Sequence, residues 1–145
     1  MKRYPKRLFH EAPTWVKSGS VFHIRIRCHR ENKIPLTDFS LGSQVIVSVI
    51  HYQNKGIWYC RLFVLMPDHL HALLSFNTEQ CMSGVIGMWK KYHHRINGIK
   101  WQDNYFDHRI RNDKALSEKC LYIRMNPVVK GLCSLPEQWP WSIES

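Results

Sequence analysis

Residues Leu62–Leu74, with the sequence LFVLMPDHLHALL, predict two adjacent strands joined by a tight turn. The stretch opens with an unbroken apolar run, and Pro67-Asp68 supplies two residue types that favour turns. Side chains alternate between the faces of a strand, so His69 and His71 are expected on one face and Leu70 on the other. Two imidazoles with this spacing can hold one metal ion. Partly buried or surface histidines without a ligand give the same pattern, so the rest of the chain must decide.

The composition predicts one cytoplasmic domain with a polyanionic partner. In 145 residues the chain carries 21 Lys and Arg against 11 Asp and Glu, a net charge of +10. This charge favours nucleic acid first and an anionic membrane surface second, and it says nothing of chemistry. The five cysteines are odd in number and lack C-x-x-C spacing, which indicates reduced thiols and disfavours a zinc site. No apolar run is long enough for a signal peptide or a membrane span, so no membrane partner is expected.

The order of predicted elements is typical of a ferredoxin-like α+β domain, strand–helix–strand–strand–helix–strand, with an extra C-terminal helix. The two crossover helices are expected on one face of an antiparallel sheet, and the histidine strand is expected in its centre beside the first strand. We interpret 1–145 as one domain. Its parts are a basic arm at 1–20, a strand at Val21–Arg27, a helix at Thr37–Gln53, strands at Ile57–Met66 and His69–Phe76, a helix at Cys81–Asn97, a strand within Trp101–Arg111, a helix at Lys114–Met125 and a tail at 127–145.

The last predicted helix carries two residues suited to phosphoryl chemistry. Tyr122 and Asn126 are four positions apart and therefore share one helix face. A phenol is a potential covalent nucleophile, and a carboxamide oxygen is a potential ligand for a hard divalent ion. Taken alone, the pair is better explained by an amphipathic core tyrosine and a C-terminal cap before proline. The helix is expected to end at Asn126, because Pro127 disfavours helical geometry in the residue before it.

Basic residues cluster at the end of the second predicted helix. Five of the six positions from Lys90 to Arg95 are basic. A few basic residues in the last turn would be enough to complement the helix dipole, so five call for another explanation. We therefore interpret part of this cluster, together with the strand residues that follow, as phosphate contacts. The candidates are Lys90, Lys91, Arg95, Arg109 and Arg111. Tyr92, within the cluster, is interpreted as a base-stacking or packing residue.

Four motifs in order, MPDHLHALL, WQDNYFDHRIR, YIRMNPVVKGL and WPWS, resemble those of the REP-associated tyrosine transposases. These are relatives of the single-tyrosine transposases in the His-hydrophobic-His (HUH) endonuclease class, and the resemblance extends from about Arg7 to Trp141. It implies the HUH endonuclease form of the ferredoxin-like fold. It also implies that His69 and His71 bind a metal, that Asn126 is the third ligand and that Tyr122 is catalytic. The chain departs from the pattern at none of these four positions.

The resemblance further implies a metal-dependent single-stranded DNA endonuclease and strand transferase. Such an enzyme uses Mg²⁺ or Mn²⁺ to polarise the scissile phosphate, while the tyrosine forms a 5′-phosphotyrosine and frees a 3′-hydroxyl. Hairpin or palindromic DNA is the expected partner, in a prokaryotic cytoplasm and associated with the nucleoid. Since the connection after Arg111 is short, a monomer whose tyrosine helix acts on its own histidines is favoured. A dimer that exchanges this helix is the alternative.

Two other functions compete with this prediction. A non-catalytic module that binds single-stranded nucleic acid would use the same fold, although the aromatic signature of RNA-recognition modules is missing from the sequence. A metal-dependent phosphoesterase would need either a second histidine motif or an Asp-His pair after the first one. Neither is present, because Ala72-Leu73-Leu74 follows His71. Covalent attachment to cleaved single-stranded DNA would distinguish the transferase from both.

Overall fold

Strand β3 (His69–Phe76) lies at the centre of an antiparallel sheet, as the sequence predicts. The computed structural model describes residues 19–77 and 79–145, and within them the sheet has five strands in the order β4-β1-β3-β2-β5. The other strands are β1 (Val21–Arg27), β2 (Trp58–Leu65), β4 (Phe106–Ile110) and β5 (Ser142–Glu144). The predicted ferredoxin-like order of the first six elements is confirmed. The predicted arm at 1–20 lies outside the described residues except for its last two positions.

The β2–β3 hairpin and the pairing of β3 with β1 set the register of the histidines. The backbone N–H of Met66 donates to the carbonyl oxygen of His69 at 2.8 Å, which closes the predicted tight turn. On the other side of β3, Arg25 lies opposite His71 and Arg27 lies opposite His69. The basic face of β1 is therefore placed directly beside the two histidines.

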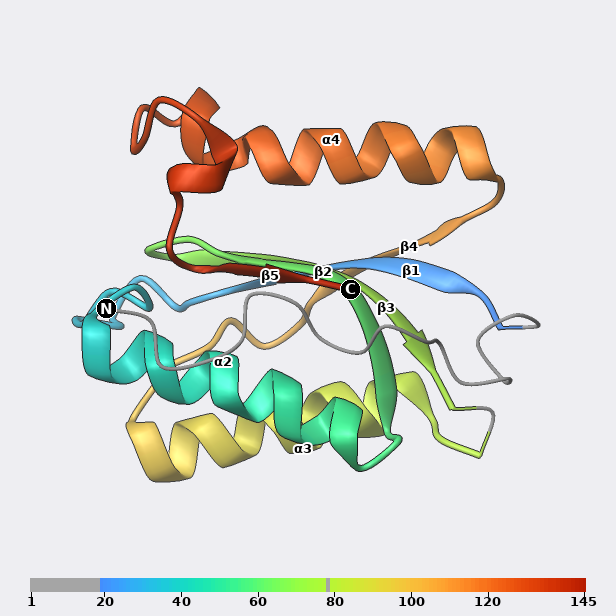
Figure 1. The fold of residues 1–145 in the computed structure, drawn as a ribbon. Coiled ribbons are helices and arrows are strands. Elements are labelled where there is room, and N and C mark those ends of the chain that lie inside the picture. The colour runs from blue at the N-terminus through green and yellow to red at the C-terminus, as the bar shows by residue number, and fades with distance from the viewer. Residues whose placement is uncertain (1–18, 78) are drawn as a thin grey trace.

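Helices α2 (Phe39–Asn54) and α3 (Met82–Asn97) both cover one face of the sheet (Figure 1). The carboxylate of Asp38 accepts from the backbone N–H of Leu41 at 3.2 Å and begins α2. Gly98 ends α3 in the left-handed region at φ 69°, which glycine adopts without a Cβ penalty. Leu70 and Ala72 of β3 point into the main core beneath these helices, so the histidines face the other way.

Helix α4 (Asp113–Val129) lies on the opposite face of the sheet (Figure 1), and it borders the groove that the two histidines line. The side chain of Asn112 accepts from Ala115 N–H at 2.8 Å and begins the helix. Ile123 is fully buried in a second, smaller core against the sheet. The predicted end at Asn126 is wrong, because the helix continues through Pro127 to Val129, and Lys130 N–H still reaches Asn126 O at 3.0 Å. Asn126 and Pro127 are both buried, and this packing outweighs the local preference against helix before proline.

The segment after α4 is more ordered than the predicted tail at 127–145. A short 3₁₀ helix, η1 (Pro136–Gln138), leads into β5, which pairs antiparallel with β2 at the sheet edge. The indole N–H of Trp139 donates to Leu65 O at 2.9 Å and anchors this return. The predicted four-stranded sheet therefore gains a fifth strand. A strand of three residues carries too little hydrophobic alternation to be recognised from sequence.

The composition also led us to expect reduced cysteines and no segment that spans a membrane. All five cysteines are free. Within 19–77 and 79–145, no helix combines the length and the apolar character that crossing a membrane requires.

Candidate active site

The structure brings the four predicted site residues together in one groove of about 800 Å³ between the sheet and α4. His69 and His71 reach it from β3, whereas Tyr122 and Asn126 reach it from α4. The prediction that the two histidines share a strand face is confirmed, and the structure places the last helix over that face.

His69 is held by its neighbour Asp68. Its Nδ1 lies 2.7 Å from Asp68 Oδ1, and the side chain is otherwise buried. The hydrogen bond from His69 lowers the pKa of the Asp68 carboxyl. Burial lowers the pKa of His69, although the carboxylate acts in the opposite direction. A neutral His69 that donates from Nδ1 keeps its Nε2 lone pair available, which is the arrangement that metal-binding histidines adopt.

His71 is buried more deeply and contacts a histidine from β1. Its Nδ1 lies 2.9 Å from Nε2 of His23, and both side chains are 3% exposed. Burial, reinforced by the neighbouring basic residues, lowers the pKa of His71 to about 3 and that of His23 to about 4. Both imidazoles are therefore neutral near pH 7. The Nε2 atom of His71 is the nitrogen left for a ligand.

Tyr122 and Asn126 occupy one face of α4 with opposite exposure. The Tyr122 ring meets the His71 ring edge-on, with centroids 6.1 Å apart, and its side chain is 55% exposed. Lys119 Nζ lies 5.2 Å from the centroid of the Tyr122 ring. Asn126 is only 7% exposed, and its Oδ1 has no hydrogen-bond partner among the described residues. A buried amide oxygen without a donor is costly unless a ligand satisfies it.

The donor set of the groove fits one hard or borderline divalent ion. No group of three or more His, Cys, Asp or Glu side chains in residues 19–77 and 79–145 is arranged to hold a metal. The third protein donor would therefore have to be the unsatisfied amide oxygen of Asn126. Two imidazole nitrogens and one carboxamide oxygen suit Mn²⁺ and are acceptable to Mg²⁺ with bound water.

The predicted phosphate contacts of α3 are not brought to this groove. Lys90, Lys91 and Arg95 belong to the helical layer on the opposite face of the sheet. Lys90 Nζ donates to the carbonyl oxygens of Gln102 at 2.8 Å and Asp103 at 3.3 Å, so it fixes the loop that precedes β4. A role for these side chains in binding DNA stays a prediction.

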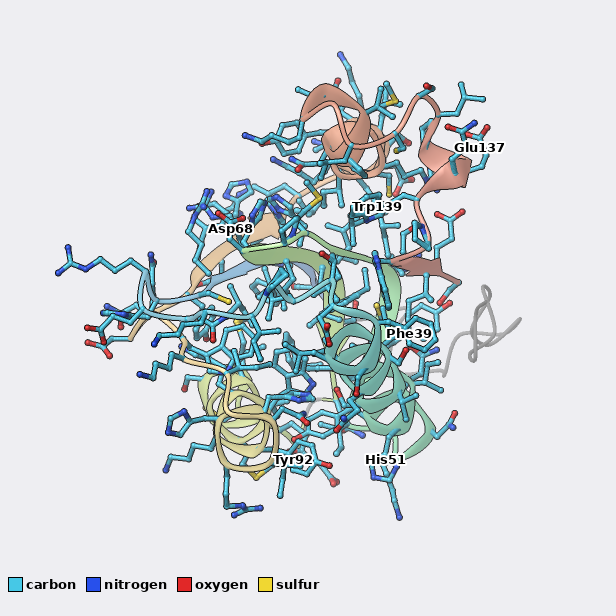
Figure 2. All side chains as sticks on the ribbon, turned by 90° about the vertical axis from the view of Figure 1, so that its left-hand side faces the viewer. Phe39, His51, Asp68, Tyr92, Glu137 and Trp139 are labelled. Carbon is cyan, nitrogen blue, oxygen red and sulfur yellow. The ribbon has the colours of Figure 1, made fainter. Side chains whose placement is uncertain are left out.

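Arg109 and Tyr92 also lie away from the histidine face. Ile110 packs in the smaller core under α4, so Arg109, the residue before it in β4, points to the opposite face. Arg111 follows β4 in the connection to α4. Figure 2 shows Tyr92 at the outer side of the helical layer, whereas Asp68 lies at the level of the sheet near the groove. Tyr92 is therefore far from the histidines.

Three cations that sequence reasoning did not select line the groove, namely Arg25, Arg27 and Lys130. The first two project from β1 on the same face as His23. The alternation in VFHIRIR and the predicted pairing of this strand with the histidine strand were the signals that would have identified them. Lys130 follows the last residue of α4, beyond the predicted end of that helix.

Fold and groove together define an α+β, ferredoxin-like protein in which a central pair of histidines faces a helix that carries a tyrosine and an asparagine. No protein-family model matches the chain. It is 25% identical over 132 residues to the REP-associated tyrosine transposase of Escherichia coli K12, which covers 88% of this chain and 78% of that protein. It is also 25% identical over 144 residues to a Haemophilus influenzae protein described as a candidate of the same kind, with 86% and 79% covered. The resemblance drawn from the motifs is confirmed.

Two solved structures share the fold. One is a REP-associated tyrosine transposase bound to a REP hairpin, with a TM-score of 0.71 and 22% identity over 93% of this chain and 82% of that chain. The other is a candidate transposase of Deinococcus radiodurans R1, with a TM-score of 0.52 and 11% identity over 86% of this chain and 98% of that chain. At these identities the likeness establishes the fold, and the groove must carry the argument for function.

Proposed function

We propose that this protein is a transposase-like enzyme that cleaves and rejoins single-stranded, hairpin-containing DNA through a covalent bond to Tyr122. One observation carries the proposal. A half-exposed tyrosine meets one of two buried, neutral histidines in a groove that also holds the unsatisfied amide oxygen of Asn126. A groove with a nucleophile, unprotonated nitrogen donors and an oxygen donor is suited to attack on a phosphodiester.

The bonds balance in a simple displacement. The Tyr122 oxygen forms a bond to phosphorus, and the bond between phosphorus and the 3′ oxygen of the preceding nucleotide breaks. The phenolic proton passes to solvent, to which the side chain is open, and the departing oxygen takes up a proton to become a free 3′-hydroxyl. The product is a 5′-phosphotyrosine that retains the phosphodiester bond energy, so attack by a 3′-hydroxyl rejoins the strand without a nucleotide cofactor.

His69, His71 and Asn126 would hold one Mg²⁺ or Mn²⁺ ion, which would polarise the scissile phosphate as a Lewis acid. Asp68 orients the imidazole of His69 through the bond to Nδ1. Lys119 Nζ lies 5.2 Å from the centre of the Tyr122 ring and so places a positive charge beside the proposed nucleophile.

The substrate class follows from the charges along the groove and from the related proteins. Arg25, Arg27 and Lys130 give the groove a positive lining suited to a phosphate backbone. One structure with this fold is bound to a REP hairpin, which supports hairpin DNA as the substrate here. The groove volume of about 800 Å³ far exceeds the space that a single metal ion occupies, which leaves room for part of a substrate.

The decisive experiment is a search for the covalent adduct. The native protein, incubated with a library of hairpin-containing single strands and Mn²⁺, is expected to give a protein–DNA band that survives a denaturing gel. Tyr122→Phe keeps the ring and removes only the hydroxyl, so the fold and DNA binding should persist while the adduct disappears. Tyr92→Phe is the matched control, because Tyr92 belongs to the opposite layer, and it should form the adduct normally.

Two outcomes would contradict the proposal. If Tyr122→Phe still forms the adduct and Tyr92→Phe does not, the nucleophile is misassigned. If the native protein binds hairpin DNA tightly and no adduct forms with any strand of the library, the non-catalytic nucleic-acid-binding module becomes the better description.

A further inference from the structure

His23 is a buried histidine of β1 that has no part in the chemistry described above. Its Nε2 lies 2.9 Å from Nδ1 of His71, and the two rings are stacked with centroids 5.2 Å apart. In the register of the sheet His23 lies opposite Leu73, so it is the diagonal neighbour of His71 across the β1–β3 pair. Diagonal neighbours on one face are within reach of long and aromatic side chains. The contact is therefore built into the strand pairing.

The contact matters because a neutral imidazole carries one N–H, on either of its two nitrogens. When the hydrogen is on Nδ1 of His71, that nitrogen donates to His23 and Nε2 keeps a lone pair. When the hydrogen is on Nε2, the same atom is a donor and cannot bind a metal. The bond made by one ring nitrogen thus decides what the other nitrogen can do. For His71, the partner that decides is His23.

The two groove histidines differ in this respect. Asp68 offers His69 a carboxylate, which only accepts, so Nδ1 of His69 must be the donor. His23 is able to accept or to donate, and its own Nδ1 is buried without a hydrogen-bond partner among the described residues. Which ring nitrogen of His71 carries the hydrogen therefore depends on the tautomer of His23. If the hydrogen of His23 is on its Nδ1, the Nε2 of His23 is free to accept from Nδ1 of His71.

We propose that His23 is a positioning residue that accepts the Nδ1–H of His71 and so holds the Nε2 lone pair of His71 for the ligand in the groove. The inference rests on the proposed function, because a metal is what gives this lone pair its use. It assigns to β1 a role in the site, beside those of β3 and α4.

The surroundings of His23 keep water away from this bond. The ring of Phe106 packs against His23 with centroids 5.4 Å apart, and the Arg25 guanidinium lies 4.9 Å from the centre of the Phe106 ring. His23 is 3% exposed as a result. A hydrogen bond in such a dry position is stronger than one in water, and its loss leaves a buried group unsatisfied.

The first test needs no metal. In protein labelled with ¹⁵N-histidine, nitrogen chemical shifts and proton couplings distinguish the protonated ring nitrogen from the bare one. In the native protein we expect the hydrogen of His71 on Nδ1. In His23→Leu, which removes the acceptor, a substantial share of it should move to Nε2, and His23→Gln, whose amide oxygen accepts, should restore the native state. A hydrogen on Nε2 of His71 in the native protein would overturn the proposal, and so would a His23→Leu spectrum identical to the native one.

The second test measures Mn²⁺ binding by calorimetry, with a His69→Ala/His71→Ala double variant as the baseline. His23→Leu is expected to bind about 10- to 100-fold more weakly than the native protein, as is usual when a partner behind a metal ligand is lost. His23→Gln should recover most of the affinity. His108→Leu, on the exposed strand β4, is the control for removing a nearby histidine and should bind as the native protein does. Native affinity in His23→Leu would contradict the proposal.

The two tests separate this inference from the function on which it rests. If the native protein binds no Mn²⁺, the metal assigned to the proposed function is wrong, whereas the nitrogen shifts of the metal-free protein still decide whether His23 is the acceptor. Should His23→Leu fail to fold, as circular dichroism would reveal, the native spectrum and the comparison with His23→Gln decide the same question.

Discussion

At the scale of single residues, the positive charges of β1 lie closest to the proposed chemistry. Arg25 and Arg27 stand directly opposite His71 and His69 in the sheet and line the groove. A strand whose phosphate lies at the two histidines must pass close to these guanidinium groups. Each contact between a cation and a phosphate releases counterions, which makes binding depend on salt.

We expect Arg25→Gln and Arg27→Gln each to weaken binding of hairpin DNA and to reduce the slope of log affinity against log salt by about 1. Glutamine keeps most of the stem and removes the charge, so packing is disturbed little. Fluorescence anisotropy of a labelled hairpin at several NaCl concentrations measures the slope. Lys91→Gln, on the helical layer across the sheet, tests the surface predicted from sequence and should change the slope less. A larger effect from Lys91 than from both arginines would move the interface to α3.

The four principal site residues could be named from the sequence because local geometry places each pair on one face and the family resemblance gives the pairs their roles. His69 and His71 share a face through the two-residue period of a strand, and Tyr122 and Asn126 through the helical turn. The alternation of VFHIRIR also puts His23, Arg25 and Arg27 on one face of their strand. Their roles were missed because these depend on which atoms meet across β1 and β3, and cross-strand register is set by tertiary packing.

At the scale of elements, α3 is fastened to α2 through a buried histidine. Ser48 Oγ donates to Val45 O, and it accepts from the Trp89 indole at 2.9 Å. His93 Nε2 lies 2.8 Å from the same hydroxyl and must therefore donate to it, while its Nδ1 accepts from Asn97 at 2.8 Å. Every polar atom of the His93 ring is satisfied in the neutral form, and burial lowers its pKa from 6.5 to about 4.

We expect this histidine to make the fold sensitive to acid. Between pH 6.5 and about 4 the unfolded chain takes up a proton at His93 and the folded chain does not, so stability is lost as the pH falls through that window. From pH 7.5 to 5 the contribution is about 2 kcal/mol. His93→Gln preserves both hydrogen bonds without a titrating group. Urea unfolding should therefore show a pH dependence smaller by about that amount than in the native protein.

An exposed histidine of α2, His51, provides the control for this measurement (Figure 2). His51→Gln makes the same substitution at a histidine outside the buried network, so a difference between it and His93→Gln can be attributed to that network. If His93→Gln and the native protein lose equal stability between pH 7.5 and 5, the buried network around His93 does not control acid sensitivity. The loss would then have to come from other groups, such as the buried His23, His69 and His71, whose pKa values are also lowered by burial.

The ends of elements were predicted well where a side chain or a glycine fixes them, and poorly where packing does. Asp38, Asn112 and Gly98 mark helix boundaries through bonds to nearby backbone or through backbone geometry. Pro127 carries an equally strong local signal, yet α4 continues through it because the residues around it are buried against the sheet. Burial of this kind is a property of the folded chain, which no local preference encodes.

At the scale of the whole molecule, the sheet separates a structural layer from a functional one. Helices α2 and α3 cover the main core on one face, whereas α4 and the groove occupy the other (Figure 1). The C-terminal strand β5 completes the edge beside β2, and Arg124 of α4 pairs with Glu144 of β5 at 2.8 Å. The order of predicted elements indicated this architecture apart from β5. The pairing of β5 depends on the segment after α4, which the indole of Trp139 anchors to Leu65 O.

The same arrangement bears on whether one chain supplies the whole site. Only Arg111 and Asn112 separate the end of β4 from the start of α4, and the helix lies across its own sheet with Ile123 buried there. The Tyr122 ring consequently meets the His71 ring of the same chain. A connection of two residues can still direct a helix onto a neighbouring subunit, but doing so would expose Ile123 and the apolar residues beneath it unless a partner helix replaced this one.

We therefore expect a monomer whose tyrosine acts beside its own histidines. Mixing His69→Ala with Tyr122→Phe tests this, because neither variant alone contains both an intact pair of histidines and a nucleophile. If each chain uses its own helix, the mixture should form no covalent adduct with hairpin DNA, and sedimentation should give one subunit per particle. A shared site would instead restore up to about a quarter to a half of the activity, since mixed dimers would contain one intact composite groove. Restored adduct formation, in proportion to the concentration of both variants, would show that α4 is exchanged between subunits.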